Sequence, residues 1–335
     1  MTETDKKYFS IDNIVANRFD ASPALAEQAV HCLELVAELA TAGLSFQFKG
    51  GNSLLLVLDA PRRFSIDVDI ATDESPERIE LCLEKAIAKN GIFLRWTKRQ
   101  HKTKPWLPLS SYYCFFNSHY VSSDEAFIML DAQLSRSPYA TRFVSICCGK
   151  LFKSDRQAEI PLTSSIIGDK LLTLGPRTLG IPVGKGKDAQ RLKHVFDVSL
   201  LLSTMPSLRE IRKSLFACMA HENDLQKKTI SAADVLADTV TFCRTVRDFP
   251  SMPVPDKAMD LSLIENITGL PGFAGHLFSK NYGWDTLKKD MARVALVMTA
   301  ACMERVSDDE FDDVLKHDSD DPEYYWKKTG EWLLQ

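Results

Sequence analysis

The chain has 335 residues, enough for two domains of ordinary size or one large domain. Hydrophobic residues make up 45% of it and charged residues 26%, as in soluble globular proteins and unlike disordered or fibrous ones. No apolar run approaches the roughly 20 residues that span a bilayer, and the polar N-terminus lacks the apolar segment of a signal peptide. These features predict a cytoplasmic protein that neither spans a membrane nor is anchored to one.

The net charge of −4 conceals an uneven distribution. Basic residues dominate from Arg95 to Lys104 and from Arg142 to Lys193, whereas acidic residues dominate from Asp308 to Glu331. A basic middle region can attract the phosphates of a nucleoside triphosphate or of RNA. The alternative is that each run forms an ordinary solvated surface.

The eight cysteines are scattered through the chain, and none forms a C-x-x-C motif. A structural zinc site or a redox motif is therefore not expected. Most of the cysteines have apolar neighbours, which predicts buried free thiols in a reducing compartment.

The first half of the chain alternates helix and strand patterns. Apolar residues recur at helical spacing from Ser22 to Ala42, with Ser22 as the cap and Pro23 at the first helical position. The next predicted elements are a strand over 46–48, a short apolar helix over 52–58, a strand over 64–70 and a helix over 76–90. Further strand patterns follow over 92–96, 112–117, 126–134 and 142–148.

Helical periodicity dominates from Ser164 to the end of the chain, with loops predicted over 175–187, 205–206, 250–255 and 269–275. We therefore predict an α+β fold. Residues 1–162 form a mixed sheet flanked by helices, and residues 163–335 form an all-helical domain. The loop from Gly180 to Lys187 is rich in glycine and lysine, so it either closes over an anionic ligand or simply connects two helices.

A paired glycine stands at the end of the first predicted strand. Gly50 and Gly51 would let the backbone approach a phosphate, and Asn52 and Ser53 add side-chain donors at the start of the next helix. A tight turn with an asparagine cap would explain the same residues. Their position just ahead of an acidic strand favours a nucleotide-binding turn.

The acidic strand carries Asp67 and Asp69, whose side chains share one face and whose Cα atoms lie about 7 Å apart. Two such carboxylates repel each other unless they are solvated or bind cations. Mg²⁺, or Mn²⁺ in its place, binds carboxylates together with the phosphates of a substrate. Ser65 falls on the same predicted face, where it could orient a phosphate.

A third carboxylate, Asp131, lies in an apolar run that predicts a buried strand. A buried carboxylate is costly unless it is paired or metal-bound. If its strand neighbours the first one, Asp131 completes a metal site with Asp67 and Asp69 and serves as the base toward an attacking hydroxyl. Otherwise it is an ordinary aspartate at the end of a strand.

The helical half contributes three further charged residues. Lys170 could contact a triphosphate as a point charge, and a solvated helix lysine is the alternative. Lys193 and Asp197 lie four residues apart on one face of a predicted helix, where a surface ion pair is the alternative. His194 is either an acid–base group or a structural histidine.

These motifs resemble those of the AbiEii-type nucleotidyltransferase toxins, which belong to the polymerase-β-like nucleotidyltransferase superfamily. The run from Phe48 to Leu54 is similar to the Lys-Gly-Gly-Thr-Ala-Leu motif of that family, and Arg63 to Asp69 is similar to its Arg-x-Ser-x-Asp-x-Asp motif. The strand aspartate, the helix lysine and the last motif of the family are matched by Asp131, Lys170 and residues 193–198.

The resemblance covers residues 46–202. Three positions depart from the family pattern: Asn52 stands in place of Thr or Ser, Ser53 in place of a small apolar residue, and His194 in place of Asp. The family's metal carboxylates are all present, so the resemblance implies an active enzyme.

The resemblance implies a Mg²⁺-dependent transfer of a nucleoside monophosphate from an NTP to an acceptor, with release of pyrophosphate. The implied acceptor is RNA, at the 3′ end of tRNA, and the implied partner is the cognate antitoxin of a toxin–antitoxin or phage-defence system. The implied metal ligands are Asp67, Asp69 and Asp131, and the implied catalytic residues are these three with Lys170 and Asp197. The implied nucleotide-binding residues are Gly50, Gly51, Asn52, Ser53, Arg63, Ser65 and Lys193.

Two other functions fit the same sequence. An enzyme of the same fold could modify a small cationic antibiotic such as an aminoglycoside, for which the acidic segment from Asp308 to Glu331 is suited. A nucleotide-binding interaction module without catalysis would bind an NTP and release no pyrophosphate.

Overall fold

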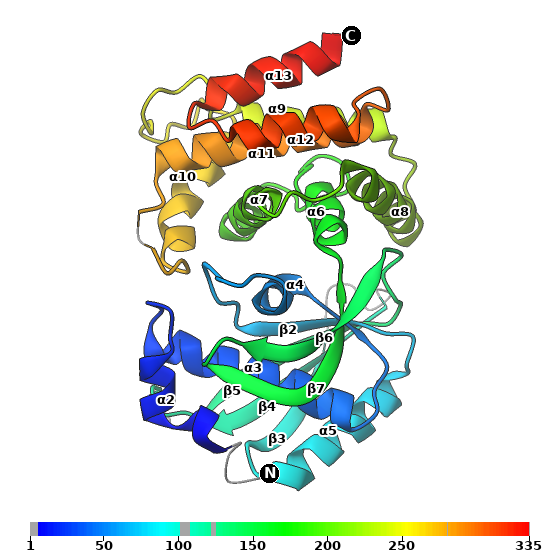
Figure 1. Ribbon diagram of the computed structural model, residues 1–335, viewed down its shortest axis with the longest axis vertical. Coiled ribbons are helices and arrows are strands. Elements are labelled where there is room, and N and C mark those ends of the chain that lie inside the picture. Colours follow the sequence, from blue (N-terminus) through cyan, green and yellow to red (C-terminus); the bar gives the residue numbers. More distant parts are fainter. Residues whose placement is uncertain (1–5, 101–107, 122–124, 280, 335) are drawn as a thin grey trace. The chain divides into compact units, whose positions relative to one another are not determined.

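The computed structural model describes residues 6–100, 108–121, 125–279 and 281–334. The chain divides into two compact units, which are drawn in Figure 1. The first comprises Met1–Ser137, Thr141–Pro161 and His276–Ser279, and the second comprises Pro138–Ala140, Leu162–Gly275 and Lys280–Gln335. A mixed sheet with helices in the N-terminal half and a mostly helical C-terminal region confirm the predicted α+β class.

The first unit is built on a sheet whose strands, within the described residues, run in the order β3-β4-β5-β2-β1-β7-β6. Neighbouring strands are antiparallel except for two parallel pairs, β2 with β5 and β1 with β7. The strands are β1 (Gln47–Lys49), β2 (Asp67–Ala71), β3 (Phe93–Arg99), β4 (Leu109–Asn117), β5 (Glu125–Gln133), β6 (Thr141–Cys148) and β7 (Phe152–Pro161).

Two long helices of the first unit begin where the sequence predicts. Ser22 and Ser75 each accept a hydrogen bond on Oγ, at 3.3 Å, from the backbone N–H three residues further on, and a proline follows each serine. The helices of this unit are η1 (Lys7–Phe9), α2 (Ile11–Ala16), α3 (Pro23–Thr41), α4 (Gly50–Ser53), η2 (Leu54–Leu56) and α5 (Pro76–Asn90).

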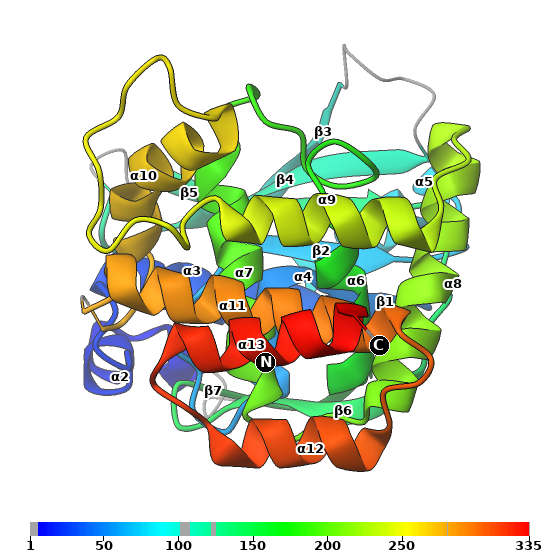
Figure 2. The ribbon, with the colours of Figure 1, turned by 90° about the horizontal axis from the view of Figure 1, so that it is seen from above.

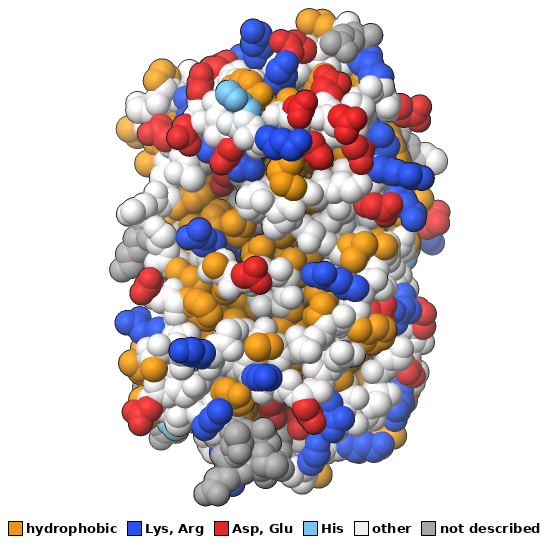
Figure 3. Space-filling model, viewed as in Figure 1, with side chains coloured by type: hydrophobic (Ala, Val, Ile, Leu, Met, Phe, Trp, Pro, Cys, Tyr) orange, Lys and Arg blue, Asp and Glu red, His pale blue; other side chains and the backbone are white. Residues whose placement is uncertain are grey.

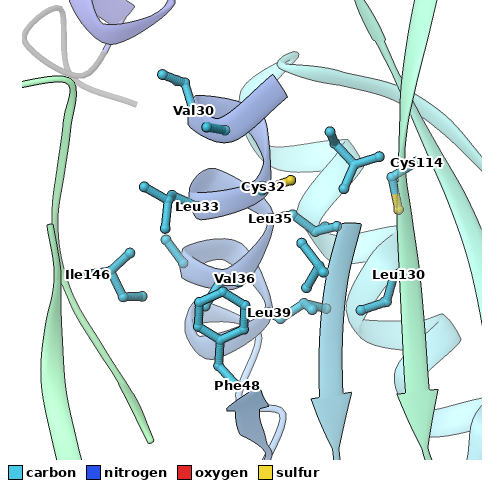
Figure 4. Close-up of a cluster of buried hydrophobic side chains, with 14 of the residues drawn as sticks. Val30, Cys32, Leu33, Leu35, Val36, Leu39, Phe48, Cys114, Leu130 and Ile146 are labelled. Atoms are coloured by element: carbon cyan, nitrogen blue, oxygen red, sulfur yellow. The ribbon is translucent and has the colours of Figure 1, made fainter. Parts of the chain in front are cut away.

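The core of the first unit lies between α3 and one face of the sheet. Figure 4 labels Leu33 of α3, Phe48 of β1 and Leu130 of β5 within one cluster of buried side chains. These three side chains are fully buried, as are Val68 and Ile70 of β2. Side chains alternate across a strand, so the residues between these apolar positions project from the opposite face of the sheet.

Some details of the first unit differ from the sequence prediction. The helix expected over 52–58 begins earlier, at Gly50, and ends at Leu56 as a 3-10 turn. The strand expected over 64–70 begins only at Asp67, because the backbone N–H of Ser65 donates to the Asn52 side chain (3.3 Å) instead of a neighbouring strand. The prediction that Ser65 lies on the strand face is therefore wrong.

Three elements of the first unit have no counterpart among the predicted elements, namely η1, α2 and β7. Helix α2 is only 6 residues long, which is too short for a clear helical period. Strand β7 exposes charged and polar residues along its first half, so it lacks the alternation of a half-buried strand.

The second unit is an assembly of helices in which α11 packs against α7, α9 and α13. Figure 2 shows α11 between α9 and α13. The helices are α6 (Thr163–Leu172), α7 (Asp188–Leu202), α8 (Leu208–Gln226), α9 (Ala232–Arg244), α10 (Leu261–Ala274), α11 (Trp284–Cys302), α12 (Asp308–His317) and α13 (Pro322–Leu334).

The prediction of a loop over 269–275 is wrong, because most of these residues belong to α10. A Cβ atom at Gly269 would lie 2.8 Å from Asp188 Oδ2 at the start of α7. The glycine therefore permits close packing of α10 against α7 and does not mark a turn.

The loop from Gly180 to Lys187 connects α6 to α7 and is fastened near its middle. The backbone N–H of Gly184 donates to Glu265 Oε1 of α10 (2.6 Å), and Glu265 forms an ion pair with the fully buried Arg191 of α7. Arg191 also donates to the carbonyl of Pro182 (3.0 Å). These contacts give the loop a structural attachment, while Lys185 and Lys187 are exposed.

The described ranges contain no helix whose length and apolar character would let it cross a membrane. All the cysteines are free, and all except Cys147 and Cys302 are buried, which confirms the prediction of free thiols.

The acidic C-terminal segment is partly neutralised by basic side chains. Lys289 Nζ lies 2.9 Å from Asp320, and the Arg247 guanidinium lies 2.7 Å from Glu323. Figure 3 shows lysine and arginine side chains interspersed with acidic ones on the face in view.

A buried histidine makes the stability of the first unit depend on pH. His31 of α3 stacks on Phe116 with ring centroids 3.7 Å apart, and its Nδ1–H donates to the carbonyl of Glu27 (2.8 Å). Burial lowers the pKa of His31 from 6.5 to about 4. Between these values the unfolded chain binds a proton that the folded chain does not, so stability is lost as the pH falls.

We predict that acidification from pH 7.5 to 4.5 reduces the free energy of unfolding of the wild type by about 3 kcal/mol more than that of His31→Phe. Phenylalanine keeps the ring stacking and removes the titration. The comparison is made by hydrogen exchange of the α3 amides at both pH values. The same loss in both proteins would rule out His31 as the source.

Candidate active site

The three aspartates singled out in the sequence gather on one face of the sheet. Strands β2 and β5 are parallel neighbours, and Asp69 lies directly opposite Asp131. Asp67 is two residues before Asp69 on β2, so its side chain projects from the same face. This face is opposite to the one that carries Val68 and Ile70 into the core. The structure thus brings together the carboxylates expected to bind metal.

The row of paired residues continues onto both flanking strands. Lys49 of β1 lies opposite Asp69, and Ser111 of β4 lies opposite Asp131. The Ser111 hydroxyl donates a short hydrogen bond to Asp131 Oδ1. Lys49 Nζ lies 3.3 Å from Ser137 Oγ, also on this side of the sheet. A cation and a hydroxyl donor therefore flank the carboxylates.

The sequence did not assign a role to Lys49 or Ser111. Lys49 belongs to the glycine motif, directly before Gly50. A signal for Ser111 exists, because Tyr112, Cys114 and Phe116 alternate as one apolar face and place Ser111 on the other. Its partner Asp131 could not be identified without the strand register.

The first glycine of the pair is required by the carboxylate beside it. Gly50 has φ +72°, which side chains rarely adopt, and a Cβ atom there would lie only 1.8 Å from Asp69 Oδ2. The backbone of the turn is thus pressed against the Asp69 carboxylate. A Cβ at Gly51 would lie 2.9 Å from Ser65 Oγ, so the second glycine brings the turn close to Ser65.

Asn52 and Ser53 are buried and hold the turn in place. Asn52 Nδ2 donates to the carbonyl of Asp67 (2.7 Å), and its Oδ1 accepts from the backbone of Ser65. The Ser53 hydroxyl donates to the carbonyl of Gly50 (2.9 Å). The side chain of Asn52 therefore joins the glycine turn to the start of β2. The contact of Asn52 and Ser53 with a nucleotide stays a prediction. In the structure, both side chains position the glycine turn.

Arg63 is buried beside the glycine turn. Its backbone forms an isolated antiparallel bridge with Leu277, and a Cβ at Gly51 would lie 3.0 Å from its guanidinium. The neighbouring Phe64 ring packs on Phe278 with centroids 4.7 Å apart. The segment His276–Ser279 therefore completes the first unit from a distant part of the chain.

A cysteine lies beneath the acidic face, on α3. Burial is the main cause that raises the pKa of the Cys32 thiol well above its ordinary value, and the charge of Asp67 adds to it. The thiol therefore stays protonated and packs as part of the core. It is a poor nucleophile despite its proximity to the carboxylates.

The other predicted catalytic residues belong to the second unit. Lys170 of α6 forms an ion pair with Asp197 of α7, with Nζ 2.9 Å from Oδ2, and both side chains are buried. The structure thus brings these two together and gives the lysine a carboxylate partner. Lys193, on the same helix as Asp197, is half-buried.

His194 takes part in a polar cluster next to this ion pair. Its Nδ1 lies 2.5 Å from Thr173 Oγ1, and the Thr173 hydroxyl donates to the carbonyl of Lys170 (2.7 Å). The Thr173 hydroxyl thus contacts both His194 and the backbone of α6. This arrangement agrees with a structural role for His194.

The acidic face is suited to a divalent cation that arrives with its own ligands. Among the described residues, no group of three or more His, Cys, Asp or Glu side chains is placed to hold a metal ion by itself. Mg²⁺ usually keeps several waters and is held by one or two carboxylates with substrate phosphates. Asp67 and Asp69, with Asp131 directly opposite, fit that mode of binding.

Comparison with protein families agrees with this arrangement. Residues 34–265 match the model of the family described as nucleotidyl transferase AbiEii toxin, type IV TA system. The matched region contains every predicted site residue. No individual curated protein matches the chain.

We predict that Gly50→Ala destabilises the first unit more than Gly91→Ala. Both glycines have positive φ, but a Cβ at Gly91 meets no atom within 4 Å. The shared backbone strain costs about 1–2 kcal/mol, and the overlap with Asp69 adds at least about 1 kcal/mol at position 50. Urea denaturation of the two variants measures the difference. Equal losses would show that Gly50 does not press on Asp69.

We predict that Asp197→Asn lowers the stability of the second unit by about 3–5 kcal/mol, because it leaves the Lys170 ammonium buried without its counter-charge. The double variant Lys170→Met, Asp197→Leu recovers most of that loss. Asp313→Asn is the matched control, since its pairing with Lys316 is exposed and such pairs contribute about 0–1 kcal/mol. Thermal unfolding of all variants tests this. An Asp197→Asn protein as stable as the control would contradict it.

Proposed function

The chain belongs to the AbiEii family of nucleotidyltransferase toxins of type IV toxin–antitoxin systems, and on this premise we propose that it transfers a nucleoside monophosphate from an NTP to the 3′ end of an RNA such as tRNA. Family membership implies an NTP substrate and a cognate antitoxin. The RNA acceptor is the finer part of the proposal. The lysine and arginine residues from Arg142 to Lys193 support it.

The observation that carries the proposal is the acidic row next to the glycine turn. Asp69 and Asp131 face each other across two hydrogen-bonded strands, and the backbone at Gly50 touches the Asp69 carboxylate. A turn without side chains leaves room for phosphate groups beside the carboxylates. Phosphoryl transfer depends on such positioning and on charge neutralisation.

Asp67 and Asp69 are the proposed ligands of Mg²⁺ or Mn²⁺, with Asp131 as the third. A divalent cation bound there would neutralise the phosphates of the NTP and lower the pKa of the attacking hydroxyl. Lys49, opposite Asp69, adds a fixed positive charge to the same row. Arg63 and Ser65, next to Gly51, are proposed phosphate contacts.

Asp131 is the proposed base. The Ser111 hydroxyl donates to Asp131 Oδ1, which fixes the orientation of the carboxylate. Oδ2 would accept the proton of the acceptor hydroxyl as its oxygen attacks the α-phosphorus. The bond from the α-phosphorus to the oxygen of the β-phosphate breaks, and pyrophosphate leaves with that electron pair.

The residues of the second unit have a more limited place in the proposal. The ion pair between Lys170 and Asp197 holds α6 against α7. Contact of Lys170 or Lys193 with the triphosphate, and an orienting role of Asp197 toward it, stay predictions.

We predict that the double variant Asp67→Asn, Asp69→Asn loses transfer by at least about 100-fold, because it removes the charges that hold the cation. The purified protein is incubated with each labelled NTP, Mg²⁺ and total tRNA. Asp155→Asn is the control, because that aspartate is 85% exposed on β7. Its activity should match the wild type.

The same assay separates the alternatives. Pyrophosphate released without label in RNA would indicate a small-molecule acceptor such as an antibiotic. NTP binding without pyrophosphate release would indicate an interaction module. Full transfer by the double aspartate variant would refute the proposed site.

A further inference from the structure

The face of the sheet that carries the carboxylates continues as a surface of aromatic and basic side chains. Phe127 and Met129 precede Asp131 on β5 at steps of two residues, so all three project from one face. On β4, Phe115 lies directly opposite Phe127, and Tyr113 lies opposite Met129. On β3, Arg95 lies opposite Phe115. We call this set the aromatic platform, and its members are Arg95, Tyr113, Phe115, Phe127 and Met129.

The rings of the platform form a cluster that is open to solvent. The Phe127 centroid lies 4.8 Å from that of Tyr113 and 5.9 Å from that of Phe115. Tyr113 and Phe115 are half-buried, but Phe127 is 47% exposed. A folded chain leaves a group of large aromatic side chains open to water mainly where a partner binds.

Basic groups adjoin the rings. The Arg95 guanidinium lies 3.6 Å from the centroid of the Phe115 ring, and Glu125 (2.7 Å) holds it there. Arg99, four residues further along β3, contacts the sulfur of Met129 (3.3 Å). Both arginines are exposed. A guanidinium can stack on a nucleobase or contact a phosphate.

We propose that the aromatic platform binds the unpaired 3′-terminal nucleotides of the acceptor RNA. This inference rests on the proposed transfer to RNA and names the surface that presents the acceptor. Bases stack on Phe127 and its neighbouring rings, while Arg95 and Arg99 face the sugar–phosphate backbone. Unpaired bases are recognised in this way, whereas a duplex keeps its bases stacked inside.

The distance from the platform to the carboxylates suits a short unpaired RNA end. Four residues of β5 separate Phe127 from Asp131, or about 13 Å at about 3.3 Å per residue. A few unpaired nucleotides span that length, so their terminal hydroxyl reaches the carboxylates. Arginine charge and continuity with the acidic row favour a nucleic acid as the occupant over a protein.

The test measures binding without NTP, by fluorescence anisotropy, of a hairpin RNA with a short 3′ overhang and of the same hairpin with a blunt end. We predict that Phe127→Ala weakens binding of the overhang RNA about 5- to 100-fold and barely alters binding of the blunt one. Phe143→Ala is the matched control, because Phe143 is 68% exposed on β6 and lies outside the platform. Phe127→Trp, which keeps a ring, should retain binding.

Transfer assays with the same variants separate this inference from the proposed function. Phe127→Ala should raise KM for the RNA while KM for the NTP stays unchanged. If Phe127→Ala binds the overhang RNA as tightly as Phe143→Ala, the platform is overturned even where the wild type transfers nucleotides. In another outcome, the wild type binds the overhang RNA through the platform and yet transfers no nucleotide to it. That result would support the platform and refute the proposed function. A change only in oligomeric state would reassign the surface to contact between copies and overturn the inference.

Discussion

Three carboxylates, Asp67, Asp69 and Asp131, project from one face of two hydrogen-bonded strands, and the surroundings of these strands fix their positions although like charges repel. The opposite face of the same strands is buried against α3, so β2 and β5 cannot twist the aspartates apart without opening the core. Gly50 accommodates the Asp69 carboxylate, and Asn52 joins the glycine turn to the start of β2. In the proposed function, a divalent cation bound there would reduce the repulsion between the carboxylates.

The charge of the acidic row also indicates what a substrate has to supply. Lys49 lies opposite Asp69 in the acidic row, and in the proposed function a cation with the phosphates it accompanies would complete the balance of charge. The same sheet face supplies the rest of the surface, since Phe127 and Asp131 belong to one strand. One pleated surface thus combines the three carboxylates with the aromatic platform. The second unit has its own buried charge pair, Lys170 with Asp197.

The sequence was most informative where the structure depends on local geometry. The two-residue period placed Asp67 and Asp69 on one face, and the serine caps located the starts of α3 and α5. Pairings between distant segments could not be predicted, because they are set by strand register. The bond from Ser111 to Asp131 and the return of residues 276–279 to the first unit are of this kind. The loop prediction at Gly269 failed because a glycine needed for helix packing resembles one needed for a turn.

In the proposed mechanism, Asp67 and Asp69 hold the divalent cation of a bound NTP. Anomalous diffraction from crystals grown with Mn²⁺ and an NTP analogue that cannot be cleaved at the α-phosphorus tests it directly. We expect a manganese peak about 2 Å from carboxylate oxygens of both aspartates, and also in contact with the phosphates. A well-ordered nucleotide whose manganese lies away from both aspartates would contradict it.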